Sequence, residues 1–417
     1  MKSWPPPVVP AVPGHGHHLR LFDTSRGEVV PIEAGHRTRM YVCGVTPYDA
    51  THLGHAATYV TFDLVVRAML DAGHEVDYVQ NVTDVDDPLL ERAARDGRDW
   101  RELATSEIDL FREDMTALGV LPPNQLLGVV ESMDEIVDAV RRLVESDAAY
   151  RVPVPAAEGT GEDVYLDLAR ATGFGEVSHW TREEMEAVFP RRGGDPERPG
   201  KRDPLDPLLW RAAREGEPSW PDDLLGPGRP GWHIECTAIS LGHLGVPFDI
   251  KGGGTDLVFP HHEMSAVQAT ALTGCDVFAR HYVHQAMVGF EGEKMSKSKG
   301  NLVLVSRLRA RGVDPMAIRL LLLAQHYRRE WEFTEALLDD AAARLELWRS
   351  AFSVNLGADA TDTIAAVRGA VADDLDTASA LAAVDAWAEK TLAGAEDDQA
   401  APGLLARSVD AILGVRL

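Results

Sequence analysis

The sequence contains few cysteines, a deficit of basic residues and no long apolar run. Its 417 residues include three cysteines, which are widely spaced and odd in number; this excludes a disulfide framework and is typical of a reducing cytoplasm. Lysine and arginine total 41 against 66 aspartate and glutamate, and the net charge of −25 argues against broad, non-specific nucleic-acid binding. No stretch approaches the ~20 consecutive apolar residues of a membrane-spanning helix. We therefore expect a cytoplasmic protein without a membrane partner.

Strand and helix patterns alternate in the first part of the chain. The spacing predicts strands at Met40–Cys43 and Glu75–Thr83, with a helix over His55–Ala72 between them. Further helices are expected at Leu89–Ala94, Trp100–Leu118 and Met133–Ser146. This order predicts an α/β fold on a parallel sheet, with ligands bound beyond the carboxyl ends of the strands. No G-x-G-x-x-G follows the first strand, which counts against a dinucleotide-binding fold.

Proline and glycine mark the other boundaries. The proline-rich residues 1–35 lack an apolar signal core and predict a disordered or polyproline lead. Glycine and proline recur from Pro153 to Gly231, which is more typical of an insertion, long loop or lid than of a core. We expect a lead (1–35), a nucleotide-binding catalytic domain in two halves (36–120 and 231–310), an insertion (121–230) and a C-terminal helical bundle (311–417).

The second half of the catalytic domain has its own pattern. The spacing predicts a helix over Trp232–Leu241, a buried strand at Phe248–Ile250, a glycine loop at Gly252–Asp256 and a helix that begins at Pro260. A strand over Tyr282–Val288 and a polar loop then follow. This half therefore repeats the strand and helix alternation of the first.

The stretch from Tyr41 to Ala57 predicts an anion site. A strand delivers Cys43 to a turn, and His52 and His55 flank Gly54 where the next helix begins. Free backbone N–H groups and the helix dipole favour phosphate there, and imidazoles can donate hydrogen bonds to phosphate oxygens. The alternative for Cys43 is an ordinary buried cysteine, which is the commoner role for a cysteine at a strand end.

A concentrated lysine patch follows the last predicted strand. Lys294 and Lys297 alternate with small polar residues between Gly292 and Gly300. Lysines on a glycine-flanked loop are typical of a segment that closes on a polyphosphate and stabilises charge in a transition state. A surface loop without a function is the alternative, and the acidity of the whole chain favours the functional interpretation.

Two cysteines and one histidine form a candidate metal site. Cys43, Cys236 and His261 each lie at a strand end or first helical turn, on the expected ligand-binding edge of the sheet. Two thiolates and an imidazole suit Zn²⁺ and leave one coordination position open. The alternative is two buried cysteines and a helix-capping histidine, and the spacing alone favours that alternative.

Several motifs together resemble a known family. His52-Leu53-Gly54-His55 and Lys294-Met295-Ser296-Lys297-Ser298 resemble the paired HIGH and KMSKS signatures of class I aminoacyl-tRNA synthetases. Further motifs resemble those of cysteinyl-tRNA synthetase and its relatives: Tyr41-Val42-Cys43-Gly44, Asn81 to Asp87, Gly231 to Cys236, and Phe259 to Glu263. The resemblance spans roughly Met40 to Tyr327. It implies a Rossmann-like parallel sheet of the class I synthetase type, with an inserted domain and a C-terminal α-helical bundle.

The resemblance also implies roles for individual residues. Cys43, Cys236 and His261 become the ligands of one zinc ion that binds the substrate thiolate. His52, His55, Lys294 and Lys297 become the catalytic residues that act on ATP, which Mg²⁺ accompanies. The residues expected around the adenylate and its nucleoside are Cys43, Gly44, Val45, Thr46, Thr58, Asn81, Val82, Thr83, Trp232, Gly254, Thr255, Asp256 and Val288. Among these, Asp256 can accept ribose hydroxyl bonds, and the glycines allow close approach.

Three departures from the cysteinyl-tRNA synthetase pattern indicate a sister family. Ser265 stands where a fourth, glutamate ligand is usual, and the chain leaves little room for an anticodon-binding module. Residues 191–196 resemble the E-R-G-G-D-P signature of the ligases of mycothiol biosynthesis, with Arg191 where glutamate is usual. This resemblance implies an enzyme that activates L-cysteine with ATP as cysteinyl-adenylate and joins it to the amine of glucosaminyl-inositol. We expect a monomer that does not use tRNA. The alternatives are a cysteinyl-tRNA synthetase and a catalytically silent nucleotide- or zinc-binding relative.

Overall fold

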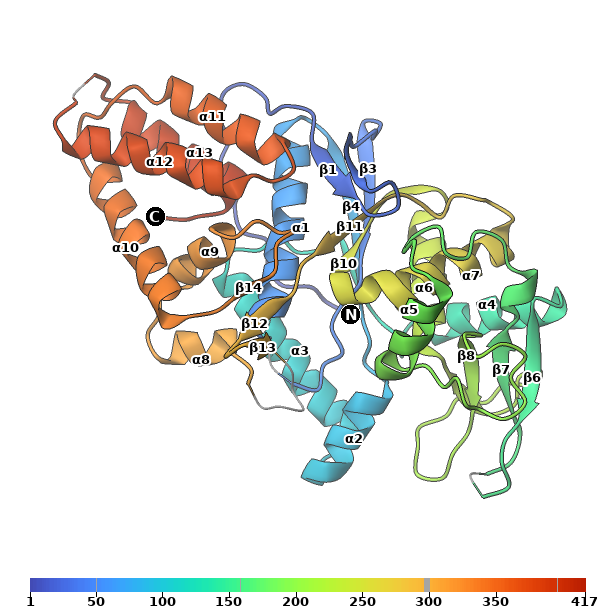
Figure 1. Cartoon of the computed structure of the whole chain (residues 1–417). Helices are drawn as coiled ribbons and strands as arrows, with labels where there is room; N and C mark the ends of the chain where they lie inside the picture. The colour runs from blue at the N-terminus through green and yellow to red at the C-terminus, as the bar shows by residue number, and fades with distance from the viewer. Residues whose placement is uncertain (50, 158, 296–300, 396) are drawn as a thin grey trace.

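A five-stranded parallel sheet forms the centre of the molecule in the computed structural model (Figure 1). The structure describes residues 1–49, 51–157, 159–295, 301–395 and 397–417. The strand order is β11-β10-β3-β4-β5, and every neighbouring pair runs parallel. The strands are β3 (Arg37–Val42), β4 (Glu75–Val82), β5 (Gln125–Gly128), β10 (Phe248–Gly254) and β11 (Ala279–Gln285). The predicted α/β fold on a parallel sheet is confirmed.

Helices cover both faces of this sheet. Along β3, Met40 and Val42 pack with α1 (Leu53–Asp71), whereas Tyr41 and Cys43 join an apolar cluster with α6 (Trp232–Leu244) and α7 (Glu263–Thr273). This alternation follows from the pleat of a strand, which points successive side chains to opposite faces. Helices on both faces explain why the strands are apolar on both sides.

Helices predicted from periodicity form close to their expected bounds. The remaining helices before the C-terminal part are α2 (Asp87–Asp96), α3 (Trp100–Ala117), α4 (Met133–Glu145) and α5 (Arg182–Val188). The C-terminal helices are α8 (Val305–Ala310), α9 (Pro315–Leu323), α10 (Glu335–Phe352), α11 (Thr361–Ala372), α12 (Thr377–Leu392) and α13 (Ala401–Leu413). They pack on the α1 side and share its core, as Figure 1 shows. Among the described residues, no helix combines the length and apolar character needed to cross a membrane.

Two buried arginines link α1 to the C-terminal helices. Asp63 lies at the centre, and its Oδ2 accepts from Arg67 Nε at 2.8 Å and from Arg319. The arginines also donate to main-chain carbonyls: Arg67 to Gly119, Asp410 and Ala411, and Arg319 to Leu118 and Leu413. Every charge in this network is therefore hydrogen-bonded, as buried charges must be.

The glycine- and proline-rich region forms ordered structure, so the expectation of a loop or lid is wrong for much of it. It contributes to an antiparallel sheet in the order β6-β7-β8-β9. The strands are β6 (Ala149–Pro153), β7 (Glu162–Leu166), β8 (Leu208–Ala212) and β9 (Gly228–Pro230). Its core contains the fully buried Trp210. Glycine and proline lie mainly in the long connections between these strands. Their frequency in the whole region made the short apolar runs of the strands hard to recognise in the sequence.

The expected disordered lead is also wrong over part of its length. Strands β1 (Arg20–Asp23) and β2 (Glu28–Pro31) form an antiparallel hairpin. Trp4 is 3% exposed, packs edge-on against Phe111 of α3, and donates from its indole to Val120 O at 2.8 Å. An isolated tryptophan among prolines gives no periodic pattern, so this packing could not be inferred from the sequence.

Two local predictions in the second half need correction. Gly252 and Gly253 belong to strand β10 and not to a loop, and Gly252 packs directly beneath Phe62 of α1, where a Cβ would lie 2.3 Å from the ring. The regular helix begins at Glu263 and not at Pro260, because Phe259 has extended backbone angles within the irregular turn Val258–His262. A small three-stranded sheet completes the fold: β12 (Val288–Phe290), β13 (Glu293–Lys294) and β14 (Trp331–Glu332).

Candidate active site

A cavity of about 460 Å³ lies at the carboxyl ends of the parallel strands. The lining combines the segment after β3, the start of α1, the first residue of α6 and the ends of β10 and β11. The residues are Cys43, Gly44, Val45, Thr46, Tyr48, His52, Gly54, His55, Thr58, Tyr59, Arg191, Trp232, Gly254, Asp256, Leu257, Gln285, Ala286, Met287, Val288 and Met295. Most of the predicted site residues therefore surround one space.

The start of α1 presents two histidines to the cavity. His52 precedes the helix in an extended conformation, and its Nδ1 accepts from the His55 N–H at 3.3 Å. The two rings stack with centroids 3.7 Å apart. A Cβ on Gly54 would lie 2.9 Å from the His52 ring, so glycine is needed between them. The helix N-terminus and two imidazoles thus meet at one wall, an arrangement suited to an anion.

Asn81 holds the segment after β3 from behind. Its Oδ1 accepts from the Gly44 N–H at 2.8 Å, and its Nδ2 donates to Thr83 Oγ1 at 3.2 Å. A Cβ on Gly44 would lie 1.5 Å from Asn81 O, which explains the glycine. Asn81, Val82 and Thr83 do not line the cavity, and Thr255 does not line it either. The asparagine is thus a support for the cavity wall.

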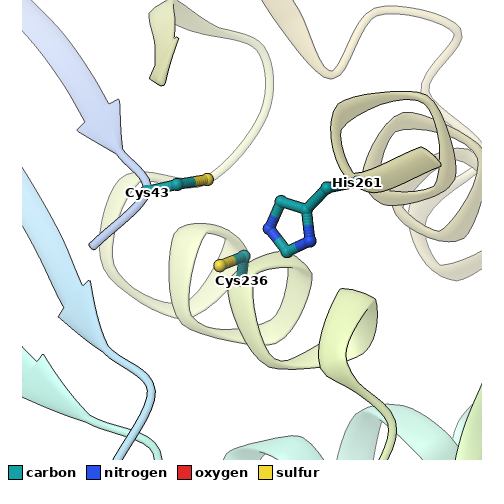
Figure 2. Close-up of side chains that lie close together, drawn as sticks. All are labelled: Cys43, Cys236 and His261. Carbon is teal, nitrogen blue, oxygen red and sulfur yellow. The ribbon is translucent and has the colours of Figure 1, made fainter. Parts of the chain in front are cut away.

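Cys43, Cys236 and His261 converge from three elements. Their candidate ligand atoms all lie within 4.8 Å of one another. Figure 2 shows Cys43 after its strand, Cys236 on α6 and His261 ahead of α7, with the side chains turned toward a common point. All three are buried, and the Trp232 ring, which lines the cavity as Cys43 does, has its centroid 4.5 Å from that of the His261 ring. The predicted juxtaposition is confirmed, whereas the identity of a bound metal remains a prediction.

The donor set of this cluster fits zinc. His261 Nε2 is buried without an oxygen or nitrogen partner among the described residues, while its Nδ1 lies 3.1 Å from Nδ1 of His233. A neighbour on one ring nitrogen orients an imidazole and leaves the other nitrogen for a metal. Two thiols and one imidazole are the borderline-soft ligands that zinc binds in proteins. Ser265 is fully buried, and its Oγ points to His233 O at 3.5 Å.

The two thiols of the cluster differ in acidity. Burial raises the pKa of both, and it is the main cause of the raised pKa of Cys236. The pKa of Cys43 is nevertheless lowered, because Cys236 donates a hydrogen bond to it and the charge of Lys251 lies nearby. Burial also keeps the pKa values of His233 and His262 well below the usual histidine range. Cys43 is therefore the more acidic thiol of the pair.

The predicted lysine loop begins at the cavity. Met295 lines the cavity, and the backbone of Lys294 lies in β13 opposite Gly289. The side chain of Lys294 and all of Lys297 lie outside the described residues. Beyond the loop, Val303 O accepts from the Leu53 N–H at 2.9 Å. The chain segments on both sides of the loop thus contact the walls of the cavity.

Arg191 contributes the only lysine or arginine side chain among the described lining residues. It has no hydrogen bond or ion pair with another described residue and its side chain is exposed. Its neighbours in the R-R-G-G-D-P segment have structural roles. Arg192 donates to Asp256 O at 2.6 Å, and Asp195 accepts from Tyr165 and from Lys201 at 2.9 Å. Only the first residue of the segment therefore reaches the cavity.

Other lining residues were missed by the sequence interpretation. They are Tyr48, Tyr59, Leu257, Gln285, Ala286, Met287 and Met295. Gln285 ends β11, so the rule that ligands bind at carboxyl strand ends could have found it. Tyr59 supports the strand end by donating to Cys43 O at 3.3 Å, a contact that no local pattern reveals.

Comparison with known proteins agrees with this geometry. A family model described as "tRNA synthetases class I (C) catalytic domain" matches residues 29–343. Proteins named "L-cysteine:1D-myo-inositol 2-amino-2-deoxy-alpha-D-glucopyranoside ligase" are similar over the full length. The one from Saccharomonospora viridis is 58% identical over 420 residues, covering 100% of both chains. The one from Thermobifida fusca is 59% identical over 417 residues, covering 100% of this chain and 99% of the relative.

Solved structures show the same fold at low sequence identity. Mycobacterium tuberculosis methionyl-tRNA synthetase bound by methionyl-adenylate superimposes with a TM-score of 0.64 at 16% identity. The match covers 91% of this chain and 92% of that chain. The central sheet and the helices around it are thus an arrangement shared well beyond the sequence relatives.

Proposed function

The chain belongs to the class I tRNA synthetase (C) catalytic-domain family, and on this premise we propose that it ligates L-cysteine to the amine of glucosaminyl-inositol at the expense of ATP. The observation that carries the proposal is the meeting of a thiol–imidazole cluster and a two-histidine helix start at one cavity. The names of the full-length relatives at 58–59% identity support the acceptor. The product would be the cysteinyl amide, with AMP and diphosphate.

Recognition of cysteine is assigned to the buried end of the cavity. Cys43, Cys236 and His261 would hold zinc, which when bound supplies a soft site for a thiolate and a poor one for a hydroxyl. Trp232 contacts His261 and lines the cavity, and it would pack against the bound amino acid. The Cys43 end of β3 is held in place by Tyr59 and, through Gly44, by Asn81. Serine would be rejected because it lacks a thiolate.

Activation by ATP is assigned to the α1 wall. A carboxylate oxygen of cysteine bonds to the α-phosphorus, and the bond to the bridging oxygen of diphosphate breaks. His52, His55 and the positive end of the α1 helix dipole would stabilise phosphate oxygens as this charge shifts. Lys294 and Lys297 would add charge from the loop, and Mg²⁺ would accompany ATP. Gly254, Asp256 and Val288 line the side assigned to the nucleoside.

The second step joins the acceptor. The neutral amine of glucosaminyl-inositol attacks the carbonyl carbon of the adenylate, and the bond from this carbon to the oxygen of AMP breaks. AMP leaves with that oxygen, and the amide nitrogen loses a proton. A net charge of −25 and C-terminal helices packed into the core around α1 favour a small acceptor over tRNA. The three cysteines are free thiols, which supports an enzyme of the reducing cytoplasm. Cysteinyl-tRNA synthetase, which shares the first step, is the rival activity.

Mass spectrometry of products tests the proposal. The purified protein is incubated with zinc, Mg²⁺, ATP, cysteine and glucosaminyl-inositol, with serine replacing cysteine as a matched control. We expect the cysteinyl amide of glucosaminyl-inositol together with AMP, and neither product with serine. Charging of tRNA with cysteine in a parallel reaction, with no amide from the amino sugar, contradicts the proposal. Failure of cysteine-dependent ATP–diphosphate exchange would instead identify a catalytically silent relative.

A further inference from the structure

A lysine is buried beside the thiol–imidazole cluster. Lys251 lies in the middle of β10, is 0% exposed, and pairs in register with Tyr41 of β3. Its Nζ lies 4.4 Å from the Tyr41 ring centroid and 5.2 Å from that of Phe278. Tyr41 and Phe278 belong to an apolar cluster that also contains the thiols of Cys43 and Cys236. A lysine is thus buried on the face of the central sheet that carries Cys43 and packs against Cys236.

This ammonium has no partner among the described carboxylates. It has no hydrogen bond to a described oxygen or nitrogen and makes no ion pair within 4.0 Å. Contacts with aromatic rings compensate only part of the hydration free energy that a cation loses on burial. The backbone places Lys251 beside the cluster, because the Cys43 N–H donates to the carbonyl of the next residue, Gly252, at 3.0 Å. Lys251 is paired with Tyr41, which shares its apolar cluster with Cys43 and Cys236. The sulfur atoms of the cluster are therefore near the ammonium.

The charges of the proposed site explain why a cation belongs there. Two protein thiolates and a neutral imidazole balance a zinc ion, so the thiolate of a bound cysteine adds one uncompensated negative charge. In the cysteinyl-tRNA synthetase pattern, a glutamate as fourth ligand would add a further negative charge. Here the neutral Ser265 stands at that position. An excess negative charge in an apolar cluster is costly unless a counter-ion is buried with it.

We propose that Lys251 is the counter-ion of the substrate thiolate: a positioning residue whose buried ammonium balances the charge that cysteine brings to the Cys43–Cys236–His261 cluster. The inference rests on the proposed function and deepens it, because it assigns thiol selection to two parts. The three ligands select a soft donor, and Lys251 favours a charged one. A neutral side chain such as serine would gain nothing from Lys251 and would leave its charge unbalanced.

Calorimetric binding of cysteine without ATP tests this role. Lys251→Met removes the charge and keeps the length, and Lys251→Gln keeps a hydrogen-bond donor without the charge. The matched control is Lys201→Met, because Lys201 is 2% exposed and lies 5.2 Å from two aromatic rings but has Asp195 as its partner. We expect both Lys251 variants to retain zinc and to bind cysteine about tenfold more weakly, as after loss of an outer-sphere partner. The control should bind cysteine like the wild type.

A stability measurement separates this role from a purely structural one. Zinc-free Lys251→Met should melt at the same temperature as the zinc-free wild type or higher, because a buried ammonium without a described carboxylate partner has been removed. Unchanged cysteine affinity in both variants, or failure of both to fold, overturns the inference. A wild type that binds cysteine without zinc, or binds neither, overturns the proposed metal site and the inference together.

Discussion

Buried cations lie on both faces of the central sheet, and the two faces treat them in opposite ways. On the α1 face, Arg67 and Arg319 share Asp63 and also donate hydrogen bonds to five main-chain carbonyls. On the opposite face, Lys251 has two aromatic rings and no described carboxylate. The α1 face is complete as folded, whereas the other is arranged for charge that a ligand brings. Changes on the first face should therefore affect folding, and changes on the second should affect binding.

The largest expected effect is loss of the metal. Cys236→Ser should abolish zinc binding and lower cysteine-dependent ATP–diphosphate exchange by more than about a hundredfold, because a ligand matters more than the outer partners, whose loss costs 10–100-fold. Zinc content by elemental analysis and the exchange rate measure this. Cys275→Ser is the matched control: Cys275 does not belong to the cluster, and its thiol donates to Val277 O at 3.3 Å. Equal zinc content in both variants would refute the assignment.

The next effect belongs to the α1 face. Asp63→Asn leaves two buried arginines without their carboxylate and should lower the free energy of unfolding by about 3–5 kcal/mol. Urea unfolding gives this value. Asp373→Asn makes the same chemical change in an exposed pair with Arg20 and should cost less than about 1 kcal/mol. Zinc affinity of folded Asp63→Asn should match the wild type; a large drop in it would remove the distinction between the faces.

An exposed cation should show a third behaviour. Arg191 lines the cavity without a described partner, so Arg191→Ala should leave stability unchanged and lower kcat/KM for ATP by about tenfold, the effect of one charge-assisted hydrogen bond reduced by solvent. Steady-state diphosphate exchange at varied ATP measures it. Arg37→Ala is a suitable control, since Arg37 begins β3 at the far end of the same sheet. An unchanged ATP dependence would exclude Arg191 from phosphate binding.

The smallest effect concerns acid stability. Burial raises the pKa of Asp63, but Arg67, Arg319 and the Leu121 N–H lower it by more. The pKa in the folded protein is therefore below the ordinary aspartate value of 3.8. The carboxylate thus contributes stability that is fully present above pH 3.8 and is lost as the pH falls through the lower, folded-state pKa. The stability difference between wild type and Asp63→Asn should be constant from pH 7 to pH 5 and shrink only below about pH 4, by at most about 1.4 kcal/mol per pH unit. A difference that shrinks near neutral pH contradicts this account.

Local sequence patterns predicted the parts of the molecule whose structure depends on contacts between residues close in the sequence. The alternation at β3, α1 and β4 and the pair His52 and His55 needed only short-range rules. The convergence of Cys43, Cys236 and His261 followed from the edge rule for parallel sheets and from the family resemblance. What escaped depends on distant contacts: Trp4 against Phe111, the antiparallel sheet among glycines and prolines, and the surroundings of Lys251. A lysine in a strand next to three glycines carries no mark of full burial.

The carbonyl groups that complete the Asp63 network come from residues far apart in the sequence. Arg67 donates to Asp410, 343 residues further along the chain, and Arg319 donates to Leu413. The helix that carries His55 is therefore held on the sheet in part by residues 410–413, which do not line the cavity.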